Sequence, residues 1–169
     1  MDIVVKDANI IIDLLNTGLA QHCWQLDLEF HTTLHVFREI RDDTQRLLMM
    51  DMIISGELIV DDFLDEEYER FLQMVEAFDE ENNLSDADCS VIILAQRYNC
   101  RLLTSDRKLK RQAENYGLKV NGLLWIVDAI VEKSILTGKE MIPYLERYRE
   151  TNERAPQNEI NKRIDRYKY

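Results

Sequence analysis

The segment IVVKDANIIIDLL, residues 3–15, joins a short run of β-branched residues to a stretch with helical spacing. Residues 3–5 suit a buried parallel strand, because a strand covered on both faces is apolar throughout. The strand ends at Asp7, and residues 9–17 have the pattern of a helix that Gly18 would terminate. An acid therefore lies where a strand gives way to a helix.

The same order of strand and then helix recurs along the chain. Further strands are expected at residues 26–32, 57–60, 101–104 and 118–120. Helices are expected at residues 34–54 after a Thr33 cap, from Asp65 onwards, at 87–98 after a Ser85 cap, from Ser105 or Asp106 to Gly117, and at 123–136, 139–151 and 157–167. This alternation predicts an α/β fold, with a mostly parallel sheet between two layers of helices.

The helix that begins at Asp65 belongs to a heavily acidic segment, residues 61–81, for which a solvated face is expected. Its apolar face should consist of Tyr68, Phe71, Leu72, Val75 and Phe78.

The composition limits the classes of protein to consider. The 169 residues, of which 46% are hydrophobic, suit one domain with a real core. A net charge of −11 argues against a general electrostatic nucleic-acid binder, although one locally basic groove stays open. Three cysteines without a C-x-x-C pair favour reduced thiols. We expect a cytoplasmic protein without membrane contact, since there is no signal sequence and no apolar run near the roughly 20 residues that cross a bilayer.

No linker or repeat divides the chain. Residues 1–135 are expected to form one α/β domain, and residues 136–169 a helical C-terminal extension packed on it or extending it. The extension and the residue before it include apolar positions that either pack inward or build a homodimer. These positions are Ile135, Leu136, Met141, Ile142 and Leu145.

Four acids, Asp7, Glu39, Asp88 and Asp106, follow strands or lie one to two turns inside a helix. Ligands of open parallel sheets bind beyond the carboxyl ends of the strands, where this fold would gather such residues. Crowded carboxylates repel each other unless a cation lies between them, so the pattern predicts a divalent metal site and phosphoryl chemistry. Each acid also has a simpler interpretation: a helix N-cap for Asp7 and Asp106, a partner of the helix dipole for Asp88, and a solvated helix acid for Glu39.

Four segments carry a resemblance to a known family. They are VVKDAN at residues 4–9, VFREI at 36–40, L-S-x-x-D-x-x-V-I-x-L-A at 84–95 and LLTSDRKL at 102–109. With these segments the chain resembles PIN-domain proteins, a metal-dependent ribonuclease fold that includes many toxins of toxin–antitoxin pairs.

The resemblance implies that Asp7, Glu39, Asp88 and Asp106 are catalytic and hold one or two Mg²⁺ or Mn²⁺ ions. It implies an endoribonuclease that hydrolyses RNA phosphodiesters by metal-activated water, with a cognate antitoxin as a further partner. The groups expected to support the metal ligands are Asn9, Thr104, Ser105 and Asp86. Asp86 is also the register alternative to Asp88, which fits the L-S-x-x-D spacing better.

Basic residues cluster directly after Asp106, at Arg107, Lys108, Lys110 and Arg111. They are either an ordinary charged helix surface or contacts to nucleic-acid phosphates beside the metal site. More basic residues, interleaved with acids, lie in the extension: Arg147, Arg149, Arg154, Lys162, Arg163, Arg166 and Lys168.

Other function classes fit less well. A non-catalytic RNA- or protein-interaction module on the same fold is the main alternative, because such a module does not need four converging carboxylates. A phosphatase of the D-x-D type is disfavoured because Asn9 occupies the second acidic position. Zinc is disfavoured because His31 and His35 lie outside any H-E-x-x-H motif.

Overall fold

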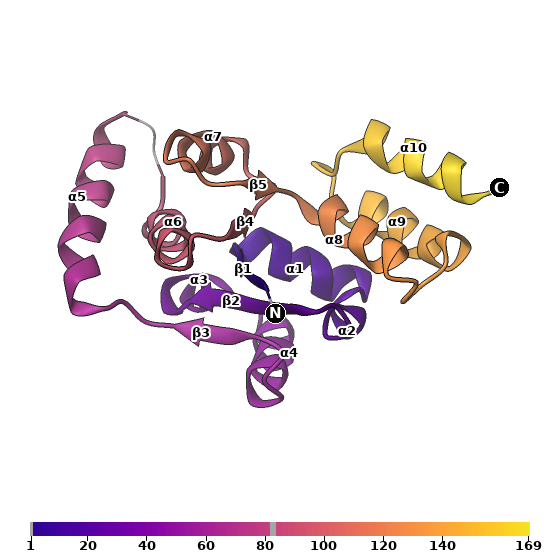
Figure 1. Ribbon diagram of the computed structural model, residues 1–169, viewed down its shortest axis with the longest axis horizontal. Coiled ribbons are helices and arrows are strands. Elements are labelled where there is room, and N and C mark those ends of the chain that lie inside the picture. The colour runs from indigo at the N-terminus through magenta and orange to yellow at the C-terminus, as the bar shows by residue number, and fades with distance from the viewer. Residues whose placement is uncertain (1, 82–83) are drawn as a thin grey trace.

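A computed structural model describes the backbone of residues 2–81 and 84–169, and these residues form a five-stranded sheet with helices around it (Figure 1). The strands are β1 (Asp2–Lys6), β2 (Leu28–Thr33), β3 (Ile59–Asp61), β4 (Arg101–Leu103) and β5 (Val120–Asn121). Their order is β3-β2-β1-β4-β5, and all neighbouring strands run parallel. In the central strand, Val5 pairs with His31 on one side and Leu102 on the other.

The helices alternate with the strands as the sequence predicted. Within the described residues they are α1 (Ala8–Thr17), α2 (Ala20–Cys23), α3 (Leu34–Glu39), α4 (Asp43–Ile54), α5 (Asp65–Glu81), α6 (Asp86–Tyr98), α7 (Arg107–Asn115), α8 (Leu123–Glu132), α9 (Gly138–Thr151) and α10 (Gln157–Tyr167). In Figure 1, α5, α6 and α7 lie on one side of the sheet, and α1, α2 and α8 on the other. The predicted three-layer α/β/α fold is therefore confirmed. None of the helices in the described ranges is long and apolar enough to cross a bilayer.

The central strand is buried along most of its length, and this includes a lysine. Val4 and Val5 lie in the core, as expected for a strand with helices on both faces. Lys6 is also fully buried, its Nζ lacks a hydrogen-bond partner, and it lies 3.6 Å from the centroid of the Phe30 ring. Burial lowers the pKa of Lys6, because an ammonium group loses its hydration there. Asp7 therefore follows a buried strand directly and lies at the edge of the sheet.

The prediction of one helix over residues 34–54 is wrong, because the chain breaks between α3 and α4. Ile40 is extended, with a ψ of 105°, and its side chain is buried. Asp42 then caps α4 by accepting a hydrogen bond of 2.8 Å from the Gln45 N–H. The break places Glu39 at the end of a short helix rather than inside a long one.

The apolar face predicted for α5 is partly wrong. Phe71, Met74 and Phe78 are buried, whereas Tyr68 and Leu72 are exposed. The helix is therefore rotated relative to the predicted face, with two large apolar side chains left on the surface.

The C-terminal helices and the loop between them contact α1 and α8. The Asn152 amide donates hydrogen bonds of 3.1 Å to both carboxylate oxygens of Asp13 in α1. Arg163 forms a paired contact with Asp128 of α8, at 2.8 and 2.7 Å. The apolar positions that the sequence left open pack inward: Met141 and Leu145 are fully buried, and Ile135, Leu136 and Ile142 pack against the core.

Candidate functional site

A cavity of about 480 Å³ lies beyond the carboxyl ends of β1 and β4. It is lined by Asp7, Ala8, Asn9, Ile12, Glu39, Arg41, Ser85, Asp88 and Asp106. The structure thus brings to one cavity four acids that come from four different junctions of the sequence. This is the edge of a parallel sheet at which ligands generally bind.

Asp7 accepts three hydrogen bonds, which come from the start of α1 and from the residue after β4. Its Oδ1 accepts a hydrogen bond of 2.7 Å from the Ala8 N–H at the start of α1. Its Oδ2 accepts one of 3.0 Å from the Asn9 amide and one of 2.9 Å from the Thr104 hydroxyl. The side-chain oxygen of Asn9 in turn accepts a hydrogen bond of 3.1 Å from the backbone N–H of Ser105. The ends of β1 and β4 are therefore tied together around one buried carboxylate.

Asp106 and Asp88 each combine helix capping with a place in the cavity. Oδ1 of Asp106 accepts hydrogen bonds from the backbone N–H groups of Lys108 and Leu109, at 2.8 and 2.9 Å. Oδ2 of Asp88 accepts the Ser85 N–H at 3.0 Å, while the Ser85 hydroxyl accepts the Asp88 N–H at 3.1 Å, a reciprocal capping box. Capping and lining the cavity are thus not alternatives, because each role uses a different part of the same carboxylate.

The electrostatics of the cavity show that the carboxylates act on one another. Burial, together with the charges of Asp88 and Glu39, raises the pKa of Asp7 from 3.8 to about 7. Burial, with a further contribution from Asp106, raises the pKa of Asp88. Partial desolvation at the exposed rim, with the charge of Asp88, raises the pKa of Glu39. Burial is the largest cause of each shift, and repulsion between the acids adds to it.

The four acids share a cavity rather than a finished coordination sphere. In the described residues, no three His, Cys, Asp or Glu side chains come close enough together to hold one ion as they stand. The donor set nevertheless suits a hard cation, because it consists of carboxylate oxygens with amide and hydroxyl neighbours. Oδ2 of Asp106 and Oδ1 of Asp88 accept no hydrogen bond from any described residue, so both are available to a ligand.

Sequence reasoning missed Arg41, which lines the cavity from the segment between α3 and α4. In the continuous helix predicted for this region, Arg41 and Glu39 would face away from each other, because residues two apart lie on different sides of a helix. The break after Glu39 removes that constraint. The signal in the sequence was that Arg41 lies only two residues after Glu39, a candidate metal ligand.

The residues predicted to support the metal ligands take different places. Thr104 contributes its hydroxyl to Asp7, and Ser105 contributes its backbone N–H to Asn9. Asp86 is exposed and does not line the cavity, although its charge contributes to the raised pKa of Glu39.

The four basic residues after Asp106 are all exposed but do not form one group. Arg107 and Lys110 line a second groove, which also contains Thr104 and Ser105. Lys108 and Arg111 line neither this groove nor the cavity of the acids.

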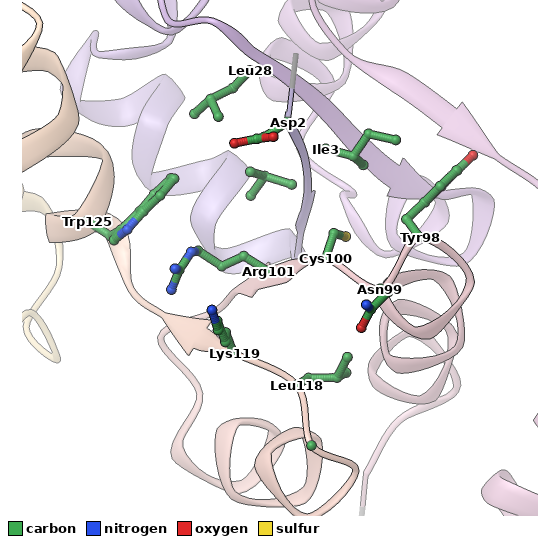
Figure 2. Close-up of a pocket in the computed structure, with 12 residues that line it drawn as sticks. Asp2, Ile3, Leu28, Tyr98, Asn99, Cys100, Arg101, Leu118, Lys119 and Trp125 are labelled. Atoms are coloured by element: carbon green, nitrogen blue, oxygen red, sulfur yellow. The ribbon is translucent and has the colours of Figure 1, made fainter.

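Another hollow, of about 520 Å³, lies at the opposite, amino ends of the strands (Figure 2). Arg101 lies over the ring of Trp125 at 4.8 Å from its centroid, and Tyr98 lies across the hollow from it. Asp2 is the one acid among the residues that line it. Because it lacks clustered acids and lies away from the ligand-binding edge of the sheet, it is the weaker candidate for an active site.

Comparison with known proteins agrees with this architecture. The chain is 38% identical over 52 residues to Ribonuclease VapC9 of Archaeoglobus fulgidus, a match that covers 31% of this chain and 38% of that protein's length. The fold is similar to the crystal structure of PAE2754 from Pyrobaculum aerophilum, with a TM-score of 0.51, 14% identity, and coverage of 77% of this chain and 98% of the other. A family model described as PIN domain matches residues 3–168. The chain therefore belongs to the PIN-domain family.

Proposed function

We propose that this chain is an endoribonuclease that depends on Mg²⁺ or Mn²⁺. The observation that carries the proposal is the common cavity of Asp7, Glu39, Asp88 and Asp106, in which the pKa values of three carboxyls are raised by burial and by one another. Carboxyls with perturbed pKa values in one cavity are typical of functional sites, and a divalent cation would offset their repulsion.

The roles of the acids follow from their contacts. Asp7 is fixed by Ala8, Asn9 and Thr104, so it would form the rigid floor of a metal site. Asp88 and Asp106 each keep one oxygen without a hydrogen bond from a described residue, and these oxygens would hold the ion from the two flanking helices.

Glu39 completes the set from the exposed rim of the cavity. A bound divalent ion would supply Lewis-acid stabilisation of phosphate charge and a lower pKa for an attacking water. Arg41, beside Glu39, would attract the negatively charged backbone of RNA to the same cavity.

The family and the name of the relative support this proposal. PIN-domain membership covers nearly the whole chain, and the matched relative is itself named a ribonuclease. A toxin role, with a cognate antitoxin as partner, is proposed on the same likeness. A homodimer stays a prediction, and it would need a surface other than the apolar positions named for it, because these pack inward.

One observation favours a second function, a non-catalytic interaction module. The described acids do not converge into a group that could hold an ion as they stand. A module of this kind would bind RNA or protein equally well without divalent ions, and its acids could be neutralised without effect.

The test is cleavage of a labelled RNA with Mn²⁺ or Mg²⁺, by wild type and by Asp7→Asn, Asp88→Asn and Asp106→Asn. Cleavage should stop in chelator and fall by about a hundredfold or more in each variant, since a metal ligand is worth several kcal/mol in the transition state. Glu66→Gln, which removes an exposed charge on α5, is the matched control and should cleave like wild type. Cleavage that survives in all three site variants would contradict the proposal.

A further inference from the structure

A groove of about 700 Å³ adjoins the candidate site, between the start of α7 and the loop that joins α9 to α10. Thr104 and Ser105 line this groove, and the same two residues hold Asp7 and Asn9 in the cavity of the acids. We call it the tail groove, with Arg107, Lys110 and Arg154 as its basic residues. Thr104 and Ser105 therefore lie between the tail groove and the cavity of the acids.

The charges of the tail groove are predominantly positive. In the part of the chain that the structure describes, the guanidinium groups of Arg107 and Arg154 have no hydrogen bond or ion pair. Lys110 lies 3.9 Å from Glu114, but both side chains are half exposed, so the pair is weak.

Glu159 is the one acid among the residues that line the groove. It lies 2.7 Å from Lys162 and 3.6 Å from Arg163, and because these pairs are partly exposed they offset only part of its charge. Helix α10 begins at Gln157 with a Pro156 cap that makes no side-chain hydrogen bond, so the positive end of its dipole adds the same sign. In a chain of net charge −11, this is a local reversal of sign beside the acids.

We propose that the tail groove binds the sugar–phosphate backbone of single-stranded RNA beside the cavity of the four acids. The substrate class rests on the proposed function, whereas the assignment of the groove does not depend on cleavage. Arg107 and Lys110 contact phosphates from α7, and Arg154 contacts them from the C-terminal extension.

A single strand is favoured over a duplex for two reasons. The volume of the groove is within the roughly 300–1,000 Å³ of pockets that hold small ligands, so it suits a short stretch of one strand. The net negative charge of the chain disfavours a long rigid polyanion, while a flexible strand can follow the basic residues of the groove. The extension is thus part of the substrate-binding surface, and Lys108 and Arg111 are not.

The experiment compares two pairs of substitutions that remove the same charge. Arg107→Gln/Arg154→Gln alters the tail groove, and Lys108→Gln/Arg111→Gln is the control on neighbouring exposed positions. Both pairs are made in an Asp7→Asn background, so that RNA stays uncut, and binding of a short labelled single-stranded oligoribonucleotide is followed by anisotropy across a salt series.

The groove pair should weaken binding by about tenfold and reduce the salt slope by about 1.4, since each lost phosphate contact on a single strand is worth about 0.7. The control pair should bind like its parent, and Arg107→Lys/Arg154→Lys should restore most of the affinity. Thermal unfolding of each variant verifies that the fold is retained.

The outcomes separate the two proposals. An equal loss in both pairs, or no loss in the groove pair, overturns the assignment of the groove. Selective loss in the groove pair with no cleavage by the wild-type protein keeps the groove and overturns the proposed nuclease. A wild-type protein that binds no RNA overturns both.

Discussion

The Thr104 hydroxyl donates a hydrogen bond of 2.9 Å to Oδ2 of Asp7, across 97 residues of sequence. The same hydroxyl oxygen accepts the backbone N–H of Asp106 at 3.1 Å. One small side chain at the end of β4 therefore positions two of the four acids relative to each other. It also stabilises the ionised form of Asp7, because a donated hydrogen bond favours the charged carboxylate.

Replacing this hydroxyl should change the pH dependence of activity. In Thr104→Val, Asp7 loses a donor, so its pKa rises further above about 7 and the acidic limb of the rate profile moves to higher pH. The fold should lose about 1–3 kcal/mol, because a buried hydrogen bond to a charged group disappears. Rate profiles and urea unfolding measure the two effects. Thr104→Ser keeps the donor and should resemble wild type. If Thr104→Val has the same pH–rate profile as wild type, the hydroxyl does not set the pKa of Asp7.

The metal-free protein should become less stable as the pH rises. The pKa of Asp7 is about 7 in the folded protein and 3.8 ordinarily, so the folded state binds the proton more tightly. The stability that this proton gives is present at low pH and is lost as the pH rises from about 4 to about 7. The loss is at most about 4 kcal/mol.

Urea unfolding in chelator across this pH range measures the effect. The difference between wild type and Asp7→Asn isolates the contribution of Asp7 from that of other groups. A difference that does not vary with pH would show that Asp7 titrates normally.

Lys6 should be a source of instability that a neutral side chain relieves. Its ammonium group is buried without a hydrogen-bond partner, and its pKa is lowered by that burial. Lys6→Met keeps much of the shape and removes the unsatisfied polar group, so we expect stability to increase by about 1–3 kcal/mol at neutral pH. Urea unfolding checks this, with Lys119→Met as the control at an exposed lysine. A destabilised Lys6→Met would mean that the contact of Lys6 with Phe30 matters more than its desolvation.

The link between the C-terminal extension and α1 should contribute measurably to stability. Burial raises the pKa of Asp13 to about 6, and the Asn152 amide partly opposes this by donating to both carboxylate oxygens. Asn152→Ala leaves that carboxylate without this donor, so the free energy of unfolding should fall by about 1–3 kcal/mol. Glu150→Ala, at an exposed position of α9, should change it by less than about 0.5 kcal/mol. Equal effects of the two substitutions would rule out a specific role for the Asn152 contact.

Much of the fold could be predicted because local signals and tertiary structure agree. The apolar run before Asp7, the glycine at the end of α1 and the Ser85 cap of α6 each appear where the pattern indicates. The chain departs from the prediction after Glu39, where Ile40 is extended and buried and Asp42 caps a new helix. Burial of one apolar side chain is a tertiary effect that a periodic pattern does not reveal.

The candidate site shows the same division. Asp7 and Asp106 could be chosen because they follow strands, and Asp88 because it lies in the first turn of a capped helix. Glu39 is expected inside a longer helix, so its choice rests on the resemblance of the VFREI segment. The role of Arg41 could not be predicted, because it depends on where the chain breaks. Nor could the pattern single out Glu67 among the acids of α5: it is buried and bonded to Arg97 at 2.9 and 2.6 Å, while its neighbours face solvent.

The most direct test of the central claim is calorimetric titration of Mn²⁺ near the Asp7 pKa of about 7, in two buffers of different ionisation enthalpy. A site built on Asp7 must lose its proton when the ion binds, so binding should release protons and the apparent heats should differ between the buffers. In Asp7→Asn, both the binding and the buffer dependence should disappear. Binding that is equally tight in Asp7→Asn, or no binding in the wild-type protein, would contradict a metal site at these four acids.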